Sequence, residues 1–457
     1  MRTTLFKYQR QGLRLLFKHK GRALLGDEMG LGKTIQALAY AWANSDLRPV
    51  VIVCPAHLKY NWEDECRIHL GIQARVLSGR KASKFGLTSA GRFIIINYDI
   101  LKDWVDVLKK LKPGLIVIDE AQYIKNISSQ RSRCVRRLCK GVKNVIALSG
   151  TFITKSPVDF WPVLNILWPK VFPSFHPFAF KYTNPRKTHW GWQFRGSKNE
   201  QELYQELLKL GYIRRLKKDV LKQLPDKQHY VVSLPLTNEK EYVTAEQDFI
   251  TWLKKQSLAK AKRAAKAIQF VKQSSLQQLA AAGKLKAIIT WIEDWLESTA
   301  PENGKLIVFA IHTKIIRALH EHFKNQAVMI DGSVHAKKRH LCIDKFTRHK
   351  TTRLVIAQLQ AAGTGWNGTA ASAVLHTELP FVPADISQAN DRAHRIGQKR
   401  KVACYYAVAH NTIEEDQCKT IQQRQKANSA ILDGNETVNA LNIHDQVAAL
   451  TLRRYKK

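Results

Sequence analysis

The stretch that most constrains this chain is the glycine-rich sequence at residues 26–34, GDEMGLGKT. An apolar run, residues 23–25, precedes it, and a segment with helical spacing, residues 35–41, follows it. A glycine-rich turn between a strand and a helix binds phosphate, because backbone N–H groups and the helix N-terminus face the anion. We therefore predict a nucleotide-binding loop, with Lys33 on the β- and γ-phosphates and the Thr34 hydroxyl on Mg²⁺.

The loop departs from the usual GxxxxGK[ST] pattern at one position. Asp27 stands where that pattern has its first glycine, whereas Gly30 and Gly32 are retained. We count all three residues as candidates for nucleotide binding. Taken alone, the spacing also fits a glycine-rich turn that only caps a helix.

A second stretch favours the nucleotide site. The buried-strand run at residues 115–118 ends in Asp119 and Glu120. A strand that ends in two carboxylates is typical of the other half of a nucleotide-hydrolysing site. Asp119 is expected to hold Mg²⁺, and Glu120 to orient and deprotonate the attacking water. By itself such a pair is often two solvated acids, but together with the loop it indicates an NTPase.

Composition narrows the class of protein. The 457 residues suffice for roughly three domains. Lys and Arg number 74 against 37 Asp and Glu, which gives a formal charge of +37. Such a chain is expected to bind a polyanion, with nucleic acid ahead of an acidic membrane surface. The seven scattered cysteines, the missing signal-peptide core and the absence of a long apolar run favour a reducing compartment and exclude secretion.

Short β-branched runs alternate with helical stretches twice along the chain. They occupy residues 50–55, 93–98, 115–118 and 145–148, and again 306–310, 327–330, 353–357 and 373–376. This pattern predicts an α/β fold with two parallel-sheet lobes. The predicted domains are an N-terminal lobe at 1–160, an inserted helical region at 161–285, a C-terminal lobe at 286–425 and a helical, basic tail at 426–457.

The predicted middle region is aromatic and basic. Its aromatic residues form either the core of a small helical unit or a base-stacking surface; they are Trp161, Trp168, Phe172, Phe175, Phe178, Phe180, Trp190 and Trp192. Residues 214–218 are expected to open a basic helix. Between Asp248 and Glu293 there are nine Lys and Arg and no acid, which favours a phosphate-backbone track over a solvated face.

Polar residues near both ends of the chain complete the candidate site. Gln9 lies just before the phosphate loop, and its amide can both donate to and accept from an adenine edge. Residues 388–398 have helical spacing that would place Arg392 and Arg395 on one face. Because the second lobe has no phosphate loop of its own, these residues suggest arginine fingers for the γ-phosphate. The alternative is a surface basic helix.

Taken together, these strings closely resemble the Swi/Snf family of helicase-like, DNA-dependent ATPases in helicase superfamily two. The matching strings are Tyr8-Gln9, Asp27 through Thr34, Cys54-Pro55 with Leu58 and Trp62, Asp119-Glu120-Ala121-Gln122, Ser149-Gly150-Thr151, Arg214-Arg215-Leu216-Lys217 before Leu224-Pro225, Asp331-Gly332-Ser333, and Gln388 through Gln398. Within the family, residues 190–197 look most like the annealing-helicase, fork-remodelling branch.

The resemblance implies two RecA-like lobes with ATP and Mg²⁺ between them, and translocation on duplex or branched DNA by a monomeric motor. Gln9 would contact adenine, Gln388 would sense the γ-phosphate or water, and Arg392 and Arg395 would be the fingers. Ser149, Gly150 and Thr151 would couple hydrolysis to movement. A cytoplasmic location is expected for a bacterial or viral protein, and a nuclear one for a eukaryotic protein.

The sequence departs from the family pattern in ways that keep other functions open. Phe152 and Lys155-Ser156 replace a proline and an Asn-Arg pair, which puts coupling in doubt. Trp366, close to Gly363, stands where leucine is usual and either packs between the lobes or stacks on DNA. No recruiting module is evident, so we expect a bare motor. The alternatives are an ATP-dependent switch with little turnover and a strand-separating helicase.

Overall fold

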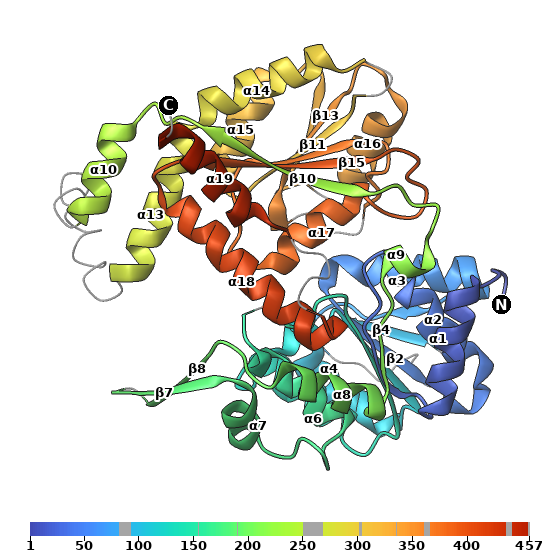
Figure 1. The fold of residues 1–457 in the computed structure, drawn as a ribbon. Helices are drawn as coiled ribbons and strands as arrows, with labels where there is room; N and C mark the ends of the chain where they lie inside the picture. Colours follow the sequence, from blue (N-terminus) through green and yellow to red (C-terminus); the bar gives the residue numbers. More distant parts are fainter. Residues whose placement is uncertain are drawn as a thin grey trace. The chain divides into compact units, whose positions relative to one another are not determined.

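The computed structural model describes residues 1–81, 93–153, 155–189, 191–249, 268–300, 304–334, 336–360, 366–435 and 441–455. The chain divides into two compact units (Figure 1). Unit 1 comprises Met1–Gln223 and Lys426–Asn439, and unit 2 comprises Leu224–Gln425 and Ala440–Lys457. The residues of the predicted middle region, 161–285, are therefore distributed over both units.

Unit 1 is built on a seven-stranded parallel sheet in the order β3-β4-β2-β5-β6-β1-β9. The strands are β1 (Arg22–Leu25), β2 (Val50–Cys54), β3 (Arg75–Val76), β4 (Phe93–Asn97), β5 (Leu115–Asp119), β6 (Asn144–Leu148) and β9 (Tyr212–Ile213). The central strands are apolar on both sides because the sheet is covered on both faces. Val51 and Val53 point into one core, and Val50 and Ile52 into the other.

Helices cover both faces of this sheet. One core includes side chains of α1 (Lys7–Lys18), α2 (Lys33–Ala43) and α3 (Lys59–Glu65). The other includes side chains of α4 (Leu101–Lys110), α5 (Gln130–Cys139), α6 (Trp161–Leu167), α7 (Phe175–Tyr182) and α8 (Glu200–Leu210). Between α7 and α8, strands β7 (Asn184–Thr188) and β8 (Gly191–Arg195) form an antiparallel hairpin.

Two interpretations of the middle region change in the structure. Trp161, Trp168, Phe172 and Phe178 are buried in the main core of unit 1, so they do not form a separate small core. Phe180 and Trp192 are exposed, and Trp190 lies outside the described residues. The predicted basic helix at 214–218 is wrong, because strand β9 ends at Ile213 and the short helix α9 (Lys217–Val220) begins only after the two arginines.

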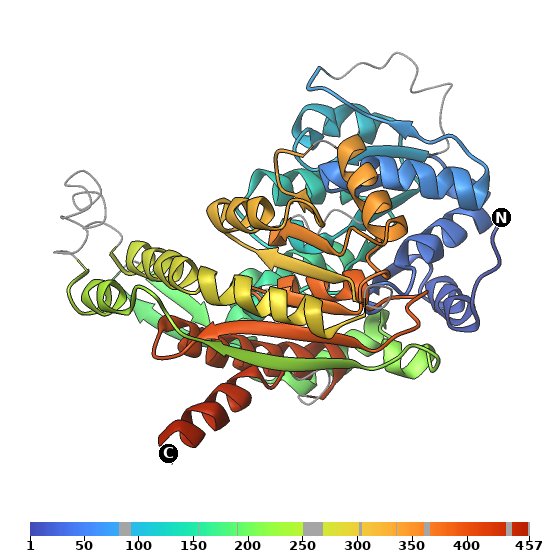
Figure 2. The same ribbon diagram turned by 90° about the horizontal axis from the view of Figure 1, so that it is seen from above.

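Unit 2 has a six-stranded parallel sheet in the order β10-β15-β14-β11-β13-β12, so the predicted α/β fold with two parallel-sheet lobes is confirmed. The strands are β10 (Lys227–Leu234), β11 (Leu306–Ala310), β12 (Ala327–Ile330), β13 (Leu354–Gln358), β14 (Ala373–His376) and β15 (Val402–Ala409). Figure 2 shows the long strands β10 and β15 side by side, paired along their whole length.

The sheet of unit 2 is also covered on both faces. One core includes side chains of α14 (Leu285–Ser298) and α15 (Thr313–His322), and the other those of α16 (Ala336–Arg348), α17 (Pro383–Ala393), α18 (Ile413–Asp433) and α19 (Ile443–Tyr455). Helices α10 (Glu239–Gln247) and α13 (Ile268–Gly283) pack on each other in a small satellite cluster. From Lys426 onward, α18 belongs to unit 1. Among the described helices, none has the length and apolarity needed to cross a membrane.

Candidate active site

The phosphate loop has the backbone that its glycines predict. It joins the end of β1 at Leu25 to the start of α2 at Lys33. Gly30 has φ +85° and Gly32 has φ +73°, in the left-handed region that glycine adopts without a Cβ penalty. A Cβ at Gly32 would also lie 2.5 Å from the side-chain nitrogen of Gln9. Both glycines are therefore required by the geometry of the turn.

Lys33 turns back over this loop. Its Nζ donates a hydrogen bond to the Asp27 carbonyl oxygen at 2.8 Å, and Thr34 follows it half-buried in the first turn of α2. Burial lowers the pKa of Lys33, while the carboxylates of Glu120 and Asp27 act in the opposite direction. The structure thus brings the lysine of the loop close to the predicted catalytic carboxylate.

The strand-end carboxylates are held by neighbouring groups. Trp62 donates its indole N–H to Asp119 Oδ2 at 2.7 Å, and the Glu120 backbone N–H donates to Asp119 Oδ1 at 2.9 Å. Burial, and next the charge of Glu120, raises the pKa of Asp119 to about 7. Glu120 itself has φ +49°, a left-handed conformation that is strained for a residue with a side chain. Such strain is often retained at functional positions.

A chain of hydrogen bonds leads from Glu120 to the predicted coupling loop. Gln122 donates to Glu120 Oε2 at 2.6 Å and accepts from the Ser149 hydroxyl at 2.7 Å, and Ser149 Oγ accepts the Thr151 N–H at 2.9 Å. A Cβ at Gly150 would lie 3.5 Å from Lys33 Nζ. The loop therefore touches both halves of the site.

The departures that follow this loop have structural explanations. Phe152 is 1% exposed and its ring stacks on Phe160 at 5.1 Å, so it fills the core of unit 1. The backbone N–H of Lys155 donates to Asp159 at 2.7 Å. The hydrogen-bonded chain from Glu120 to Thr151 is present although the proline is missing.

Asp27 has a partner that the sequence analysis did not identify. Its fully buried carboxylate accepts hydrogen bonds from Arg215 through Nε, at 2.8 Å, and through Nη2, and from Gln36 Nε2 at 2.9 Å. Arg215 Nη2 also donates to Gln36 Oε1 at 2.6 Å. A buried acid in a phosphate loop requires a counter-ion. Two features of the sequence could have indicated this ion pair: an acid at a position where the pattern has glycine, and a double arginine later in the chain.

Arg214 connects three segments of unit 1. Its Nη1 donates to the carbonyl oxygens of Gly26, at 2.7 Å, and Gly150, at 3.1 Å. Its Nε donates to Asp433 at the end of α18, at 2.7 Å. The two arginines thus hold the phosphate loop and the coupling loop from inside the unit, rather than facing a phosphate backbone.

Gln9 lies beside the phosphate loop, and its amide is already bonded. It is 4% exposed on α1; Oε1 accepts the Phe6 N–H at 3.0 Å and Nε2 donates to the Leu31 carbonyl at 3.2 Å. Contact with an adenine edge requires Gln9 to exchange at least one of these bonds for the base.

The predicted arginine pair of unit 2 does not share a helical face. Helix α17 ends at Ala393, and Arg395 lies in the following turn, so the prediction of one helix over 388–398 is wrong. Gly397 has φ +97°, and the Gln398 amide donates to the carbonyls of Thr369, Ala371 and Ala393. These contacts stop the helix.

Of the other predicted residues in this region, Arg392 is 7% exposed and its Nη1 donates to the Trp366 carbonyl at 3.3 Å. Gln388 is half-buried, one turn before Arg392 on α17. The Trp366 ring lies 6.4 Å from Phe309, in the core of unit 2. Gly363 lies outside the described residues.

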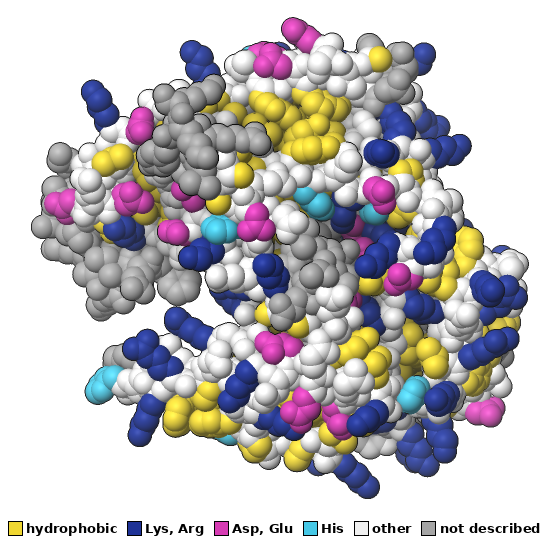
Figure 3. Space-filling view, in the orientation of Figure 1, with side chains coloured by type: hydrophobic (Ala, Val, Ile, Leu, Met, Phe, Trp, Pro, Cys, Tyr) yellow, Lys and Arg dark blue, Asp and Glu magenta, His cyan; other side chains and the backbone are white. Residues whose placement is uncertain are grey.

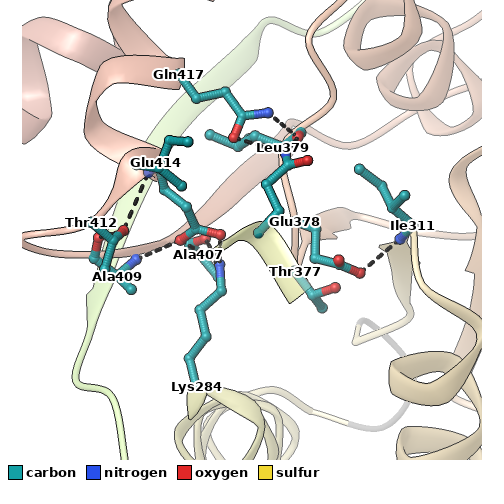
Figure 4. A network of polar contacts seen from close by, with 12 residues as sticks. Lys284, Ile311, Thr377, Glu378, Leu379, Ala407, Ala409, Thr412, Glu414 and Gln417 are labelled. Carbon is teal, nitrogen blue, oxygen red and sulfur yellow. Dashed lines mark hydrogen bonds and ion pairs between the residues drawn. The ribbon is translucent and has the colours of Figure 1, made fainter. Parts of the chain in front are cut away.

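Most of the predicted basic track also lies outside the described residues, which exclude 250–267. Lys284 is described, and for it the prediction is wrong. It is fully buried, and its Nζ donates to both Glu414 oxygens, at 2.7 and 2.8 Å, and to the Ala407 carbonyl at 2.6 Å (Figure 4). Lys284 is therefore part of the interior of unit 2.

The fold and the site define a helicase-like protein with two parallel-sheet units and, within the described ranges, one phosphate loop. The chain belongs to the SNF2-related family. Residues 8–288 match the SNF2-related domain, and residues 283–397 match the helicase conserved C-terminal domain.

Relatives from animals match along nearly the whole chain. The DNA annealing helicase and endonuclease ZRANB3 of Mus musculus is 30% identical over 455 residues, which is 95% of this chain and 41% of the relative. The SWI/SNF-related matrix-associated actin-dependent regulator of chromatin subfamily A-like protein 1 of Bos taurus is 32% identical, over 93% of this chain and 44% of the relative. Its homolog in Caenorhabditis elegans is 30% identical, over 92% of this chain and 61% of the relative. The chain thus spans about half the length of these relatives.

Among solved structures, the Sulfolobus solfataricus SWI2/SNF2 ATPase core in complex with dsDNA is similar, with 26% identity and a TM-score of 0.46. The match covers 98% of this chain and 97% of that one.

Proposed function

We propose that this chain is an ATP-dependent translocase on double-stranded DNA, which hydrolyses ATP to remodel branched DNA or protein–DNA complexes without processive strand separation. The observation that carries the proposal is the hydrogen-bonded chain from Glu120 through Gln122 to Ser149, next to Lys33. It joins the group that would activate water to a loop that would respond to the state of the nucleotide.

The residues of unit 1 supply the groups for phosphoryl transfer to water. Lys33 neutralises the β- and γ-phosphates, and Glu120, held by Gln122, orients the water and takes its proton. The oxygen donors of Asp119 and Thr34 suit Mg²⁺, a hard cation. Burial, and next the charge of Glu120, raises the pKa of Asp119, and two carboxylates in such a buried place fit a position for a divalent ion. When bound, Mg²⁺ neutralises charge that develops on the phosphate oxygens.

Three residues of unit 2 belong to the proposal through family membership. Arg392 and Arg395 are assigned to stabilise the transferred phosphoryl group, and Gln388 to sense it. Gln9 is assigned to recognise adenine. It would do so by giving up one of its present hydrogen bonds, to Phe6 or Leu31, for a hydrogen bond to the base.

DNA is the proposed polyanionic track. The charge of +37 favours nucleic acid, and one relative carries the name DNA annealing helicase. Because phosphate contacts release counterions, the affinity for duplex is expected to fall steeply with salt. A flat salt response would argue against a backbone track.

The test is displacement of a third strand from a triplex that lies ahead of a duplex loading site. Wild-type protein with ATP is expected to displace it, and Glu120→Gln is expected to bind ATP without displacing it. Phosphate released per enzyme separates a motor from a switch: many turnovers support the translocase, and about one contradicts it. Melting of a plain duplex under the same conditions would instead indicate a strand-separating helicase.

A further inference from the structure

The hairpin formed by β7 and β8 is not used by the proposed nucleotide site. It extends away from α7 and α8 in unit 1 (Figure 1). In its register Arg186 lies opposite Gln193, and Lys187 opposite Trp192. Directly opposite residues share a face and alternate residues change face. Arg186 and Arg195 therefore lie on one face, and Lys187 and Trp192 on the other.

One face of the hairpin is anchored to α7 by aromatic contacts. The Phe194 ring lies 5.6 Å from Phe175 and 5.5 Å from Phe180, both edge to face. Trp192 meets Phe180 edge to face at 4.8 Å. These contacts fix the hairpin on the unit, so its outer residues are presented on a supported ribbon.

The hairpin lies in a segment without negative charge. Between Asp159 and Glu200 there is no acidic residue, and the basic residues are Lys170, Lys181, Arg186, Lys187, Arg195 and Lys198. Arg186, Lys187 and Arg195 are exposed, and none of them forms an ion pair with another described residue. Figure 3 shows dark blue and cyan side chains over the hairpin on the face in view. The charge suits a phosphate backbone.

Trp192 indicates which DNA structure the hairpin fits. It is 46% exposed although its edge contact to Phe180 is made, so much of the indole faces solvent. Aromatic side chains bind nucleic acid by stacking on base faces. In a continuous duplex each base face is covered by the neighbouring pair, whereas a branch point exposes one.

We propose that the β7–β8 hairpin binds the branch point of DNA, with Arg186 and Arg195 on backbone phosphates at one face of the hairpin and Trp192, at the other face, stacked on the base pair exposed there. The inference rests on the proposed function, because it names the DNA structure on which that activity would act.

The test compares binding of a labelled three-way fork and a continuous duplex of equal length, without ATP. Trp192→Ala is expected to weaken fork binding about fivefold or more and duplex binding by less than about twofold. Trp192→Phe is the matched control, because it retains an aromatic face; it is expected to keep most of the fork affinity. Equal losses on both DNAs, or no loss, would overturn the proposal.

A second pair of variants tests the charge and does not depend on the folding of Trp192→Ala. The double variant Arg186→Gln with Arg195→Gln is expected to make the fall of log affinity with log salt less steep for the fork, by about 2 in the slope. Lys110→Gln with Lys140→Gln removes two exposed charges elsewhere on unit 1 and serves as control. If the two double variants behave alike, the hairpin is not the contact. Failure of the proposed function is a separate result: wild-type hydrolysis that no DNA stimulates.

Discussion

Each unit contains a turn that joins a strand of its sheet to a helix, but the groups at the start of the helix differ between the two units. In unit 1 the turn between β1 and α2 runs from Gly26 to Gly32, and no acidic residue or side-chain cap occupies the start of α2. In unit 2 only Ile311 and His312 separate β11 from α15. The start of a helix attracts anions in both cases.

In unit 2 that position is filled by the chain itself. Glu378, which is 3% exposed, accepts the backbone N–H of Ile311 at 2.8 Å (Figure 4). It also accepts the backbone N–H of His312 at 3.1 Å and pairs with the His312 ring. In unit 1 the buried acid Asp27 is turned away to Arg215 and Gln36. A carboxylate, Glu378, thus closes the turn of unit 2 to phosphate, whereas Arg215 binds Asp27 and keeps the turn of unit 1 open.

The largest effect is expected from Glu120→Gln, which leaves the open turn intact and removes the base. Hydrolysis is expected to fall about 10²- to 10⁴-fold, because a neutral amide cannot take the proton of water. Binding of a fluorescent ATP analogue is expected to stay within a few-fold of wild type. Asp46→Asn, an exposed acid of the same unit, is the control. Substantial turnover in Glu120→Gln would remove Glu120 from the mechanism.

Asp27→Ala tests whether the ion pair keeps the loop in place. It leaves the Arg215 guanidinium mostly buried without its carboxylate, and the free energy of unfolding of unit 1 is expected to fall by about 3–5 kcal/mol. Denaturant unfolding measures the loss. Asp27→Ala combined with Arg215→Ala is expected to recover part of it. If the single variant is as stable as wild type, Arg215 does not depend on Asp27.

Unit 2 is expected to lose stability in acid through His376. This residue is fully buried on β14 and bonds to Asn390 at 2.8 Å, and burial lowers its pKa to about 4. Between pH 6.5 and 4 the unfolded state takes up a proton and the folded state does not. The free energy of unfolding should therefore fall by about 1.4 kcal/mol per pH unit as pH decreases in this window.

His376→Gln retains a donor for Asn390 and removes this titration. The free energy of unfolding, measured as a function of pH, should change less steeply in the variant than in wild type between pH 6.5 and 4. Parallel curves for the variant and wild type would contradict the assignment to His376.

The smallest effect is expected from Glu378→Gln, which weakens the internal carboxylate in the closed turn. The expected loss of unfolding free energy is about 1–3 kcal/mol, because the two backbone N–H groups and the ring of His312 lose a charged acceptor. Calorimetric titration with ATP is expected to give one site per chain before and after the change, because the glutamine amide oxygen can still accept the two backbone N–H groups and fill the turn. A second site in the variant would contradict this expectation, because the turn would then be closed by the charge of Glu378 only.

The sequence predicted what is local. The phosphate loop, the strand-end carboxylates and the central strands of both sheets follow from apolar runs and glycines at short spacing. Pairings across long separations were not visible: β9, only two residues long, joins the sheet beside β1. Arg215 pairs with Asp27 although 188 positions separate the two residues in the sequence. No local pattern encodes such contacts.

The end of α17 is a second feature that local spacing did not predict, because the helix ends earlier than the spacing indicates. Helical spacing continues to residue 398, but the chain turns after Ala393 because Gln398 bonds to the carbonyls of Thr369 and Ala371. Those partners come from another part of the chain, so the spacing alone placed Arg395 on a helix that had already ended.

The most direct test of the central claim is steady-state ATP hydrolysis measured without DNA, with single-stranded DNA, with plain duplex and with a fork. We expect strong stimulation by duplex or fork, and little by single strands. Hydrolysis that is the same with and without every DNA would contradict it, since the site would then not be coupled to a duplex track.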